Sequence, residues 1–274
     1  MSRRLDASVW LGRFPFRYSA QSDVGTYLGR MRKLGFGGAL VSSIEAIFTE
    51  DSYPAEEVLA RDLSDHPELL HYKVVNPKCH WWKRDLDRAV DELGVVGIRL
   101  VCRFHGHDLE DPDLGAALEY AAETDLPAVI HYRMQDYRTQ WMMQMDEPPD
   151  GKPEDLVRML QRPPVGRLVL AGLHYSDILS ISEHIEDLDT VLVDTSRLKG
   201  PWRTLEKLGE KLDVGGSLAY GSLWPLCIPE CPLEQITNSA LSEGEKERIL
   251  GGNLSRLLPR LHYLRSDMHG SLCT

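Results

Sequence analysis

The chain of 274 residues lacks three features that would each define a class of protein. No apolar stretch approaches the roughly 20 residues that a helix needs to cross a bilayer. The start, Met1-Ser2-Arg3-Arg4, reaches Asp6 without the apolar region of a signal peptide. Positive charge is not in excess either, because the net charge is −11 and a phosphate backbone requires a basic face. We therefore expect a cytoplasmic protein that binds neither membranes nor nucleic acids.

Cysteines are few and show no pairing pattern. The sequence has five, at Cys79, Cys102, Cys227, Cys231 and Cys273, and none forms a C-x-x-C motif. Cys227 and Cys231 lie four residues apart, which is the wrong spacing for a zinc knuckle. An odd count without such a motif is typical of free thiols in a reducing compartment.

Short runs rich in Val, Leu and Ile alternate with amphipathic segments. Nearly continuous apolar runs are typical of parallel strands that are covered on both faces. Helical patterns lie between them, for example Leu86, Ala89, Val90 and Leu93 at i, i+3, i+4 and i+7. The runs that we interpret as strands lie at residues 5–9, 38–41, 70–75, 97–101, 128–131, 167–173, 190–193 and 217–220.

This alternation predicts an α/β protein with a single (β/α)8 TIM-like barrel domain over residues 1–274. The alternative is an open, doubly wound sheet, but no G-x-G-x-x-G motif follows the first strand. Several residues mark helix boundaries. They are Pro112 and Pro201 at helix starts, a capping box from Ser242 to Glu245, and Gly94 at a helix end.

The segment 133–152 is long for a connection between a strand and a helix. It contains Trp141, four methionines and the pair Pro148-Pro149. It could be a lid or a contact surface for a partner, and an ordinary loop insertion accounts for it equally well.

In a barrel of this kind the chemistry lies just beyond the C-terminal ends of the strands. The fifth predicted strand ends at His131 and the sixth leads into His174, while the fourth carries Arg99. The last strand runs into a turn at 221–225, which contains Leu223.

In the order of these strand-end residues and motifs, the sequence resembles the amidohydrolase superfamily, in particular its amidohydrolase-related branch, also called amidohydrolase 2. The resemblance covers nearly the whole chain. It implies a barrel and an activity among metal-dependent hydrolases and decarboxylases of small carboxylic acids. The motifs that carry it are Asp6, Gly97-Ile98-Arg99-Leu100, His131 after Leu126-Pro127, His174, Asp194-Thr195-Ser196, the Gly-Ser-x-x-Pro turn at 221–225 and Gly252-Asn253-Leu254-Ser255-Arg256-Leu257-Leu258.

The resemblance also implies a metal site, and most of its ligands are replaced. In that family a His-x-His pair on strand one, a His on each of strands five and six and an Asp on strand eight hold the metal. His131 and His174 are kept, but Ser8, Trp10 and Leu223 stand at the other positions. A catalytic zinc needs about three protein ligands. A carboxylate left in a dry pocket without its cation would be costly, and leucine removes that cost.

We therefore expect no cofactor. The alternative is a zinc or other divalent ion that His131 and His174 bind together with His105 or His107, two residues on the loop after strand four. A polar, partly exposed loop explains His105 and His107 more simply.

The catalytic candidates are His131 and His174, since a neutral imidazole can act as a general base toward water near pH 7. Arg99 and Arg133 are expected to orient a carboxylate and to stabilise developing negative charge. Further substrate-binding candidates are Arg17, His105 and Asp136. For each arginine the alternative is an ion pair, with partners among Asp6, Glu45, Asp136 and Asp194.

Three functions remain open at this stage. The first is an amidohydrolase-like hydrolase that acts on a small carboxylate-bearing compound without the usual divalent metal. The second is a catalytically inactive relative, a pseudoenzyme, that binds a ligand or partner. The third is a metal-dependent hydrolase or decarboxylase with atypical ligands. The expected partner is a small acidic molecule, and self-association into a homo-oligomer is left open.

Overall fold

Parallel strands form the centre of the molecule in the computed structural model, which describes residues 3–16, 22–134, 152–162, 166–186 and 188–258. The strands follow one another in sequence order in one eight-stranded sheet. Their bounds are β1 Arg4–Leu11, β2 Phe36–Ser43, β3 Leu69–Val74, β4 Gly97–Val101, β5 Ala128–His131, β6 Leu168–Ala171, β7 Val191–Asp194 and β8 Leu218–Ala219.

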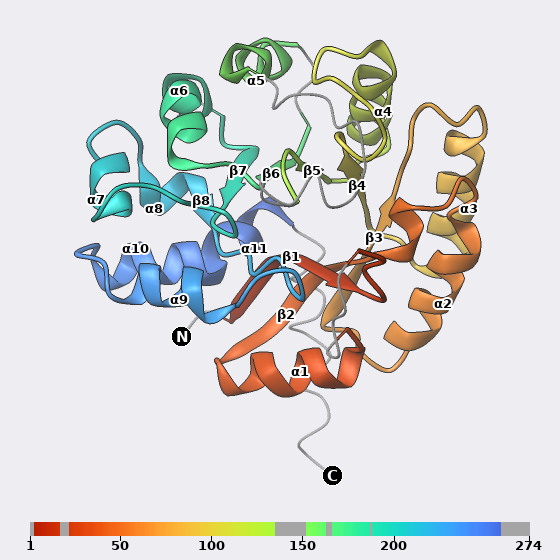
Figure 1. Cartoon of the computed structure of the whole chain (residues 1–274), viewed down its shortest axis with the longest axis horizontal. Coiled ribbons are helices and arrows are strands. Elements are labelled where there is room, and N and C mark those ends of the chain that lie inside the picture. The colour runs from red at the N-terminus through yellow and green to blue at the C-terminus, as the bar shows by residue number, and fades with distance from the viewer. Residues whose placement is uncertain (1–2, 17–21, 135–151, 163–165, 187, 259–274) are drawn as a thin grey trace.

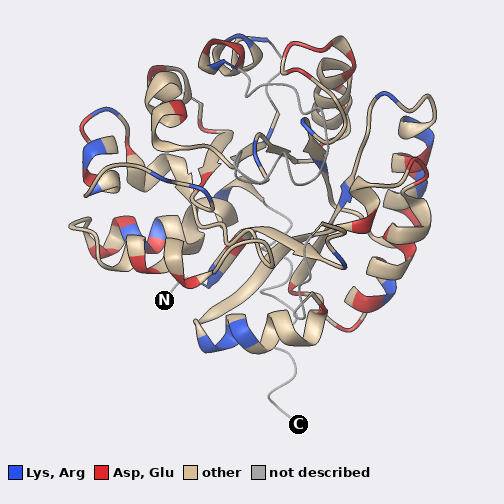
Figure 2. Cartoon of the chain, viewed as in Figure 1, with Lys and Arg blue, Asp and Glu red and all other residues tan. Residues whose placement is uncertain are grey.

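Helices surround the strands, as Figure 1 shows. Their bounds are α1 Val24–Lys33, α2 Tyr53–Leu63, α3 Trp82–Leu93, α4 Pro112–Glu123, α5 Pro153–Leu160, α6 Tyr175–Ile185, α7 Thr204–Leu208, α8 Val214–Ser217, α9 Glu230–Thr237, α10 Glu243–Glu247 and α11 Asn253–Leu257. Many of the acidic and basic residues lie on these outer helices, as Figure 2 shows. None of the described helices is both long and apolar enough to cross a membrane.

The sheet nearly closes on itself where the last strand region meets the first. The backbone N–H of Ala7 donates to the carbonyl of Tyr220 at 2.9 Å, and that of Trp10 donates to the carbonyl of Trp224 at 2.8 Å. The eight parallel strands with helices between them therefore confirm the predicted (β/α)8 barrel, and the open-sheet alternative is wrong.

Most of the predicted helix boundaries agree with the structure. Gly94 ends α3 with φ of 66°, a left-handed conformation that favours glycine. Asp111 caps α4 just before Pro112, and Ser242 opens a capping box with Glu245. Pro201 does not begin a helix, because α7 begins only at Thr204.

Three apolar clusters divide the buried interior. The largest packs the helices against the outside of the strands. A second fills the inside of the barrel with residues such as Tyr72 and Val129, and it includes Leu254 from α11. The third, which we call the mouth cluster, contains residues at or just after the C-terminal strand ends. Its buried members are Trp10, Phe14, Ile44, Ala46, Ile47, Val74, Val101, Met134 and Leu223. The mouth of the barrel is therefore largely apolar among the described residues.

Candidate functional site

Two positions where the resemblance implies metal ligands lie in the mouth cluster. Trp10 and Leu223 are both fully buried there. Leu223 also has φ of 52°, in the left-handed region that a residue with a side chain seldom adopts. Residues held in such conformations concentrate at functional sites. The turn after β8 thus keeps a strained backbone while it places an apolar side chain at the mouth.

Below this cluster, the guanidinium of Arg99 lies inside the barrel. One nitrogen, Nη1, donates to the carbonyl of Val9 at 3.2 Å, and Nη2 donates to those of Leu40 at 3.1 Å and Ala7 at 3.4 Å. The face of the Trp10 ring lies 4.8 Å from the guanidinium carbon. Burial lowers the pKa of Arg99 to about 10, which leaves the group charged at neutral pH. Arg99 is therefore a buried cation held by strand carbonyls.

The same guanidinium contacts His131. Nη1 of Arg99 lies 3.4 Å from Nε2 of His131, and the Trp10 and His131 rings have centroids 5.0 Å apart. Since arginine has no acceptor, Nε2 must accept and the ring proton lies on Nδ1. Burial and then the Arg99 charge lower the pKa of His131 well below 6.5. His131 is thus a neutral ring with a buried N–H that has no hydrogen-bond partner among the described residues.

A second polar group joins the ends of β5 and β6. Arg133 forms a buried ion pair with Asp177, and Oδ2 of Asp177 also accepts from the backbone N–H of His174 at 2.8 Å. Burial and then the charge of Arg133 lower the pKa of His174. Its Nε2 is buried without a hydrogen-bond partner in the described chain. The ion-pair alternative therefore applies to Arg133, although its partner, Asp177, is a residue that the sequence analysis did not consider.

The histidines after β4 have structural partners. Nε2 of His105 hydrogen-bonds the carbonyl of Ile47 at 3.1 Å, and burial lowers the pKa of His105 to about 4. His107 lies between Asp111 and Asn76, with both contacts at 3.2 Å. In the described ranges no group of three or more His, Cys, Asp or Glu side chains could hold a metal ion. The donor set that the structure describes therefore does not fit the divalent metal implied by the resemblance.

Two fully buried carboxyl groups lie on β1 and β7, and the sequence analysis assigned them no role in a site. Oδ1 of Asp6 accepts from the backbone N–H groups of Ser222 at 2.9 Å and Ser8 at 3.1 Å. Asp194 accepts from the Ser196 hydroxyl at 2.8 Å. Burial raises the pKa of Asp6 to about 7, and the charge of Asp194 contributes to the rise. Burial raises the pKa of Asp194 as well.

Arg197, on the loop after β7, was not among the predicted site residues. Its side chain is buried, and Nη1 donates to the carbonyl of Met134 at 3.3 Å. No sequence pattern singled it out, whereas the His174-x-x-Asp177 spacing of a helix start could have identified Asp177. Two predicted site residues, Arg17 and Asp136, lie outside the described residues, and so does most of the predicted segment 133–152.

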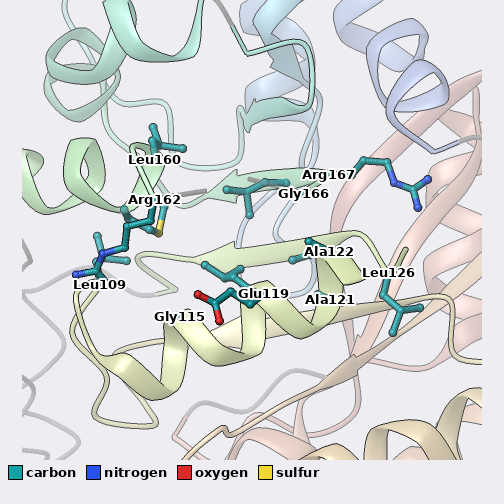
Figure 3. A pocket seen from close by; sticks show the side chains of 14 residues that line it. Leu109, Gly115, Glu119, Ala121, Ala122, Leu126, Leu160, Arg162, Gly166 and Arg167 are labelled. Carbon is teal, nitrogen blue, oxygen red and sulfur yellow. The ribbon is translucent and has the colours of Figure 1, made fainter. Parts of the chain in front are cut away.

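A hollow elsewhere in the molecule contains none of the predicted site residues. It lies outside the barrel and is lined mainly by apolar side chains of α4, α5 and the start of β6 (Figure 3). Arg162, Arg167 and Glu119 also line it. Because this lining brings together no set of catalytic groups, we place the candidate site at the mouth of the barrel.

Comparison with known proteins agrees with this barrel. A sequence model of a family described as amidohydrolase matches residues 82–260. The chain belongs to this family. No curated protein matches the amidohydrolase chain.

Solved structures share the fold of this amidohydrolase family member over almost its whole length. A 2,6-dihydroxybenzoate decarboxylase from Rhizobium is 13% identical, with a TM-score of 0.69 over 95% of this chain and 99% of that chain. A 5-carboxyvanillate decarboxylase from Sphingomonas paucimobilis is 16% identical, with a TM-score of 0.68 over 94% and 99%. At these identities the likeness establishes the fold alone.

A third structure with this fold bears on the metal. A dihydroxybenzoic acid decarboxylase from Polaromonas sp. JS666 holds manganese and the inhibitor 2-nitroresorcinol. It is 13% identical, with a TM-score of 0.69 over 94% of this chain and 97% of that chain. A neighbour with this fold thus binds a metal, and our expectation that the present chain has no cofactor stays a prediction.

Proposed function

We propose that this chain releases carbon dioxide from a small aromatic carboxylic acid that binds at the mouth of the barrel. One observation carries the proposal: buried donors without partners lie beside an apolar mouth cluster. Among the described residues, Nδ1 of His131 and Nε1 of Trp10 have no hydrogen-bond acceptor. A buried donor without a partner costs roughly 1–3 kcal/mol, and a bound acceptor group would remove that cost.

The apolar part of the substrate would pack on aromatic side chains. Phe14, Phe16, Phe48 and Phe104 form a connected group whose ring centroids lie 5.2 to 5.8 Å apart. Phe14 belongs to the mouth cluster, and Phe48 and Phe104 pack against it. A planar ring fits such edge-to-face surroundings well, which supports an aromatic acid over a purely aliphatic one.

In the proposed reaction the carbon–carbon bond to the carboxylate breaks, carbon dioxide leaves, and the electron pair stays on the ring, which then takes up one proton from solvent. An apolar mouth excludes water. Without water around it the localised charge of a carboxylate is poorly stabilised, which favours its departure as carbon dioxide. The His131 N–H and the charge of Arg99 behind it would stabilise negative charge on the ring or on a ring oxygen. In this proposal His131 acts as a donor, not as the base that the sequence analysis expected, because Arg99 occupies its basic nitrogen.

The comparisons support decarboxylation over hydrolysis. The neighbours named above are decarboxylases of hydroxybenzoates and a related aromatic acid. Among the described residues, the mouth has the buried charge of Arg99 but no group of side chains that could hold a metal ion. This supports a reaction in which Arg99 supplies the positive charge. We therefore propose a decarboxylase that works without a divalent metal.

Hydrolysis is the second candidate, and one observation favours it. Nε2 of His174 is buried without a described partner, and the lowered pKa keeps the ring neutral at pH 7. A neutral imidazole nitrogen that carries a lone pair can remove a proton from water during attack on a lactone or amide. A non-catalytic role in ligand binding remains an outcome of the test below.

The test is a substrate screen with matched variants. The purified chain is incubated with 2,6-dihydroxybenzoate, 5-carboxyvanillate and a panel of aromatic acids, lactones and amides, and carbon dioxide and acid release are both measured. We expect carbon dioxide from an aromatic acid, with at least a hundredfold loss in His131→Asn and little change in His80→Asn, which alters an exposed histidine. Lactone or amide hydrolysis that fails in His174→Asn would favour the second candidate. A complete absence of turnover would contradict both.

A further inference from the structure

Three arginine side chains are buried at or below the mouth of the barrel, and they differ in what neutralises them. Arg99, Arg133 and Arg197 are 0%, 7% and 6% exposed. Arg99 is held by three strand carbonyls and the Trp10 ring. Arg133 forms an ion pair with Asp177. A buried charge is costly unless other groups compensate it, and here a carboxylate compensates Arg133 while three carbonyls and an aromatic ring compensate Arg99.

Arg197 does not follow that rule within the described part of the chain. Its one hydrogen bond there joins Nη1 to the carbonyl of Met134, and Nε has no partner. No carboxylate of the described residues lies within ion-pair distance of it. A guanidinium carries five N–H donors in a planar fork that matches a carboxylate. The side chain therefore has both an uncompensated charge and the donors to bind an anion.

The fold holds Arg197 beside His174. Its loop is fixed to the start of α6, because the backbone N–H of Tyr175 donates to the carbonyl of Lys199 at 3.0 Å. Since His174 immediately precedes Tyr175 and Arg197 lies two residues before Lys199, this bond brings the loop that carries Arg197 beside His174, and the charge of Arg197 is also among the causes that lower the pKa of His174. The unpartnered Nε2 of His174 adds a second polar atom at the same position. Both residues follow C-terminal strand ends, where ligands bind in barrels.

We propose that Arg197 and His174 form a carboxylate-binding subsite. The inference rests on the proposed function and narrows its substrate class. An ion pair to arginine stabilises a carboxylate and so opposes its loss as carbon dioxide. The carboxylate on Arg197 is therefore the one that the substrate keeps, while another carboxylate leaves near the mouth cluster. The substrate is thus an aromatic acid with two carboxylates.

Binding of unreactive probes tests the subsite without any need for turnover. Isothermal titration calorimetry compares benzoate and isophthalate with benzamide, which has the shape of benzoate but no charge. We expect the wild type to bind each carboxylate at least tenfold more tightly than benzamide. Arg197→Gln should remove this preference, Arg197→Lys should keep part of it, and Arg84→Gln, which alters an exposed arginine of α3, should leave it unchanged.

Thermal unfolding without ligand separates binding from a structural role. If Arg197 is an uncompensated buried charge, Arg197→Gln should melt at the same temperature as the wild type or higher. A preference for carboxylates that survives in Arg197→Gln, or tighter binding of inorganic phosphate than of benzoate, would overturn the subsite. So would a wild type that does not distinguish benzoate from benzamide. If the subsite is overturned but carbon dioxide is still released, the proposed function stands. If Arg197 binds carboxylates as expected but no substrate is turned over, only the proposed reaction is refuted.

Discussion

The guanidinium of Arg99 lies 3.4 Å from Nε2 of His131, so a permanent cation contacts one of the two histidines at positions where the resemblance implies metal ligands. The contact fixes the ring proton on Nδ1 and turns a potential base or ligand into a donor. It also links β4 to β5, where Val101 pairs in register with His131.

Replacement of Arg99 tests this relationship. Arg99→Met leaves the carbonyls of Ala7, Val9 and Leu40 without their donor, and we expect a loss of about 3 kcal/mol in the free energy of unfolding. The pKa of His131 should rise toward 6.5, because the Arg99 charge is one cause of its depression. Urea unfolding and an NMR titration of His131 measure the two effects. In Arg99→Lys, which keeps the charge, the pKa should stay low; an equal rise in both variants would contradict this account.

The Arg133–Asp177 pair predicts a large effect from a single buried carboxylate. Asp177→Asn leaves the Arg133 charge buried without its partner and weakens the cap on the His174 N–H. We expect a loss of about 3–5 kcal/mol in the free energy of unfolding. The matched control is Asp189→Asn in the exposed pair with Arg256, where the expected loss is below about 1 kcal/mol. Chemical denaturation of both variants checks the difference, and equal losses would show that burial does not govern these pairs.

The barrel could be predicted in detail because its strands are covered on both faces and read as continuous apolar runs. The bounds predicted for β4 and β5 are those of the structure, 97–101 and 128–131. The last strand was harder, because β8 has only two residues and the barrel closes largely through bonds of Ala7 and Trp10 to the segment after it. Closure of this kind depends on contacts between distant segments, which no local pattern contains.

The site could be predicted only in part. Strand ends identified His131 and His174, and the expected ion-pair alternative applies to Arg133. The role of Arg99 as an internal cation depends on carbonyls from β1 and β2 that approach it in space. Arg197 was not predicted for a similar reason, because the sequence does not show whether an arginine is buried or exposed. Burial and pairing, not residue type, distinguish them.

The metal content of the purified protein tests directly whether its side chains bind a divalent metal. We expect less than about 0.1 equivalent of zinc or manganese per purified chain, since a catalytic site needs about three protein ligands and the described residues provide no such group. Any activity found in the screen should be unchanged by EDTA and by added manganese. Mass spectrometry of the metal content and assays with chelator measure this. Stoichiometric manganese, with activity lost in EDTA, would instead establish a metal enzyme with atypical ligands.

Leu223 allows the complementary test, in which the acidic residue of the family pattern is put back. Leu223→Asp places a carboxylate in the apolar mouth cluster with no described cation to pair it. We expect the free energy of unfolding to fall by several kcal/mol, on the order of 3–5. Added manganese should not restore the loss, because Ser8 and Trp10 still replace the other ligands. Leu223→Asn, which is polar but uncharged, controls for lost packing and should be less destabilising at pH 8; full rescue by manganese would contradict this expectation.

The buried carboxyl of Asp6 predicts how stability depends on pH. Its pKa is raised by burial to about 7 in the folded chain, against 3.8 for an ordinary aspartate. Between these two values the folded state keeps a proton that the unfolded state releases, so stability falls as the pH rises from about 4 to about 7 and is level above that. This difference in pKa corresponds to a loss of about 4 kcal/mol.

Asp6→Asn removes this titration while it keeps an oxygen for the N–H groups of Ser8 and Ser222. Urea unfolding at pH 5 and pH 8 should therefore show a large drop for the wild type and a clearly smaller one for Asp6→Asn. Some dependence should remain, because burial also raises the pKa of Asp194. The charge of Asp194 is one cause of the raised Asp6 pKa, so Asp194→Asn should shift the wild-type transition to lower pH. An unchanged slope in Asp6→Asn would mean that Asp6 is ionised in the folded chain throughout this range.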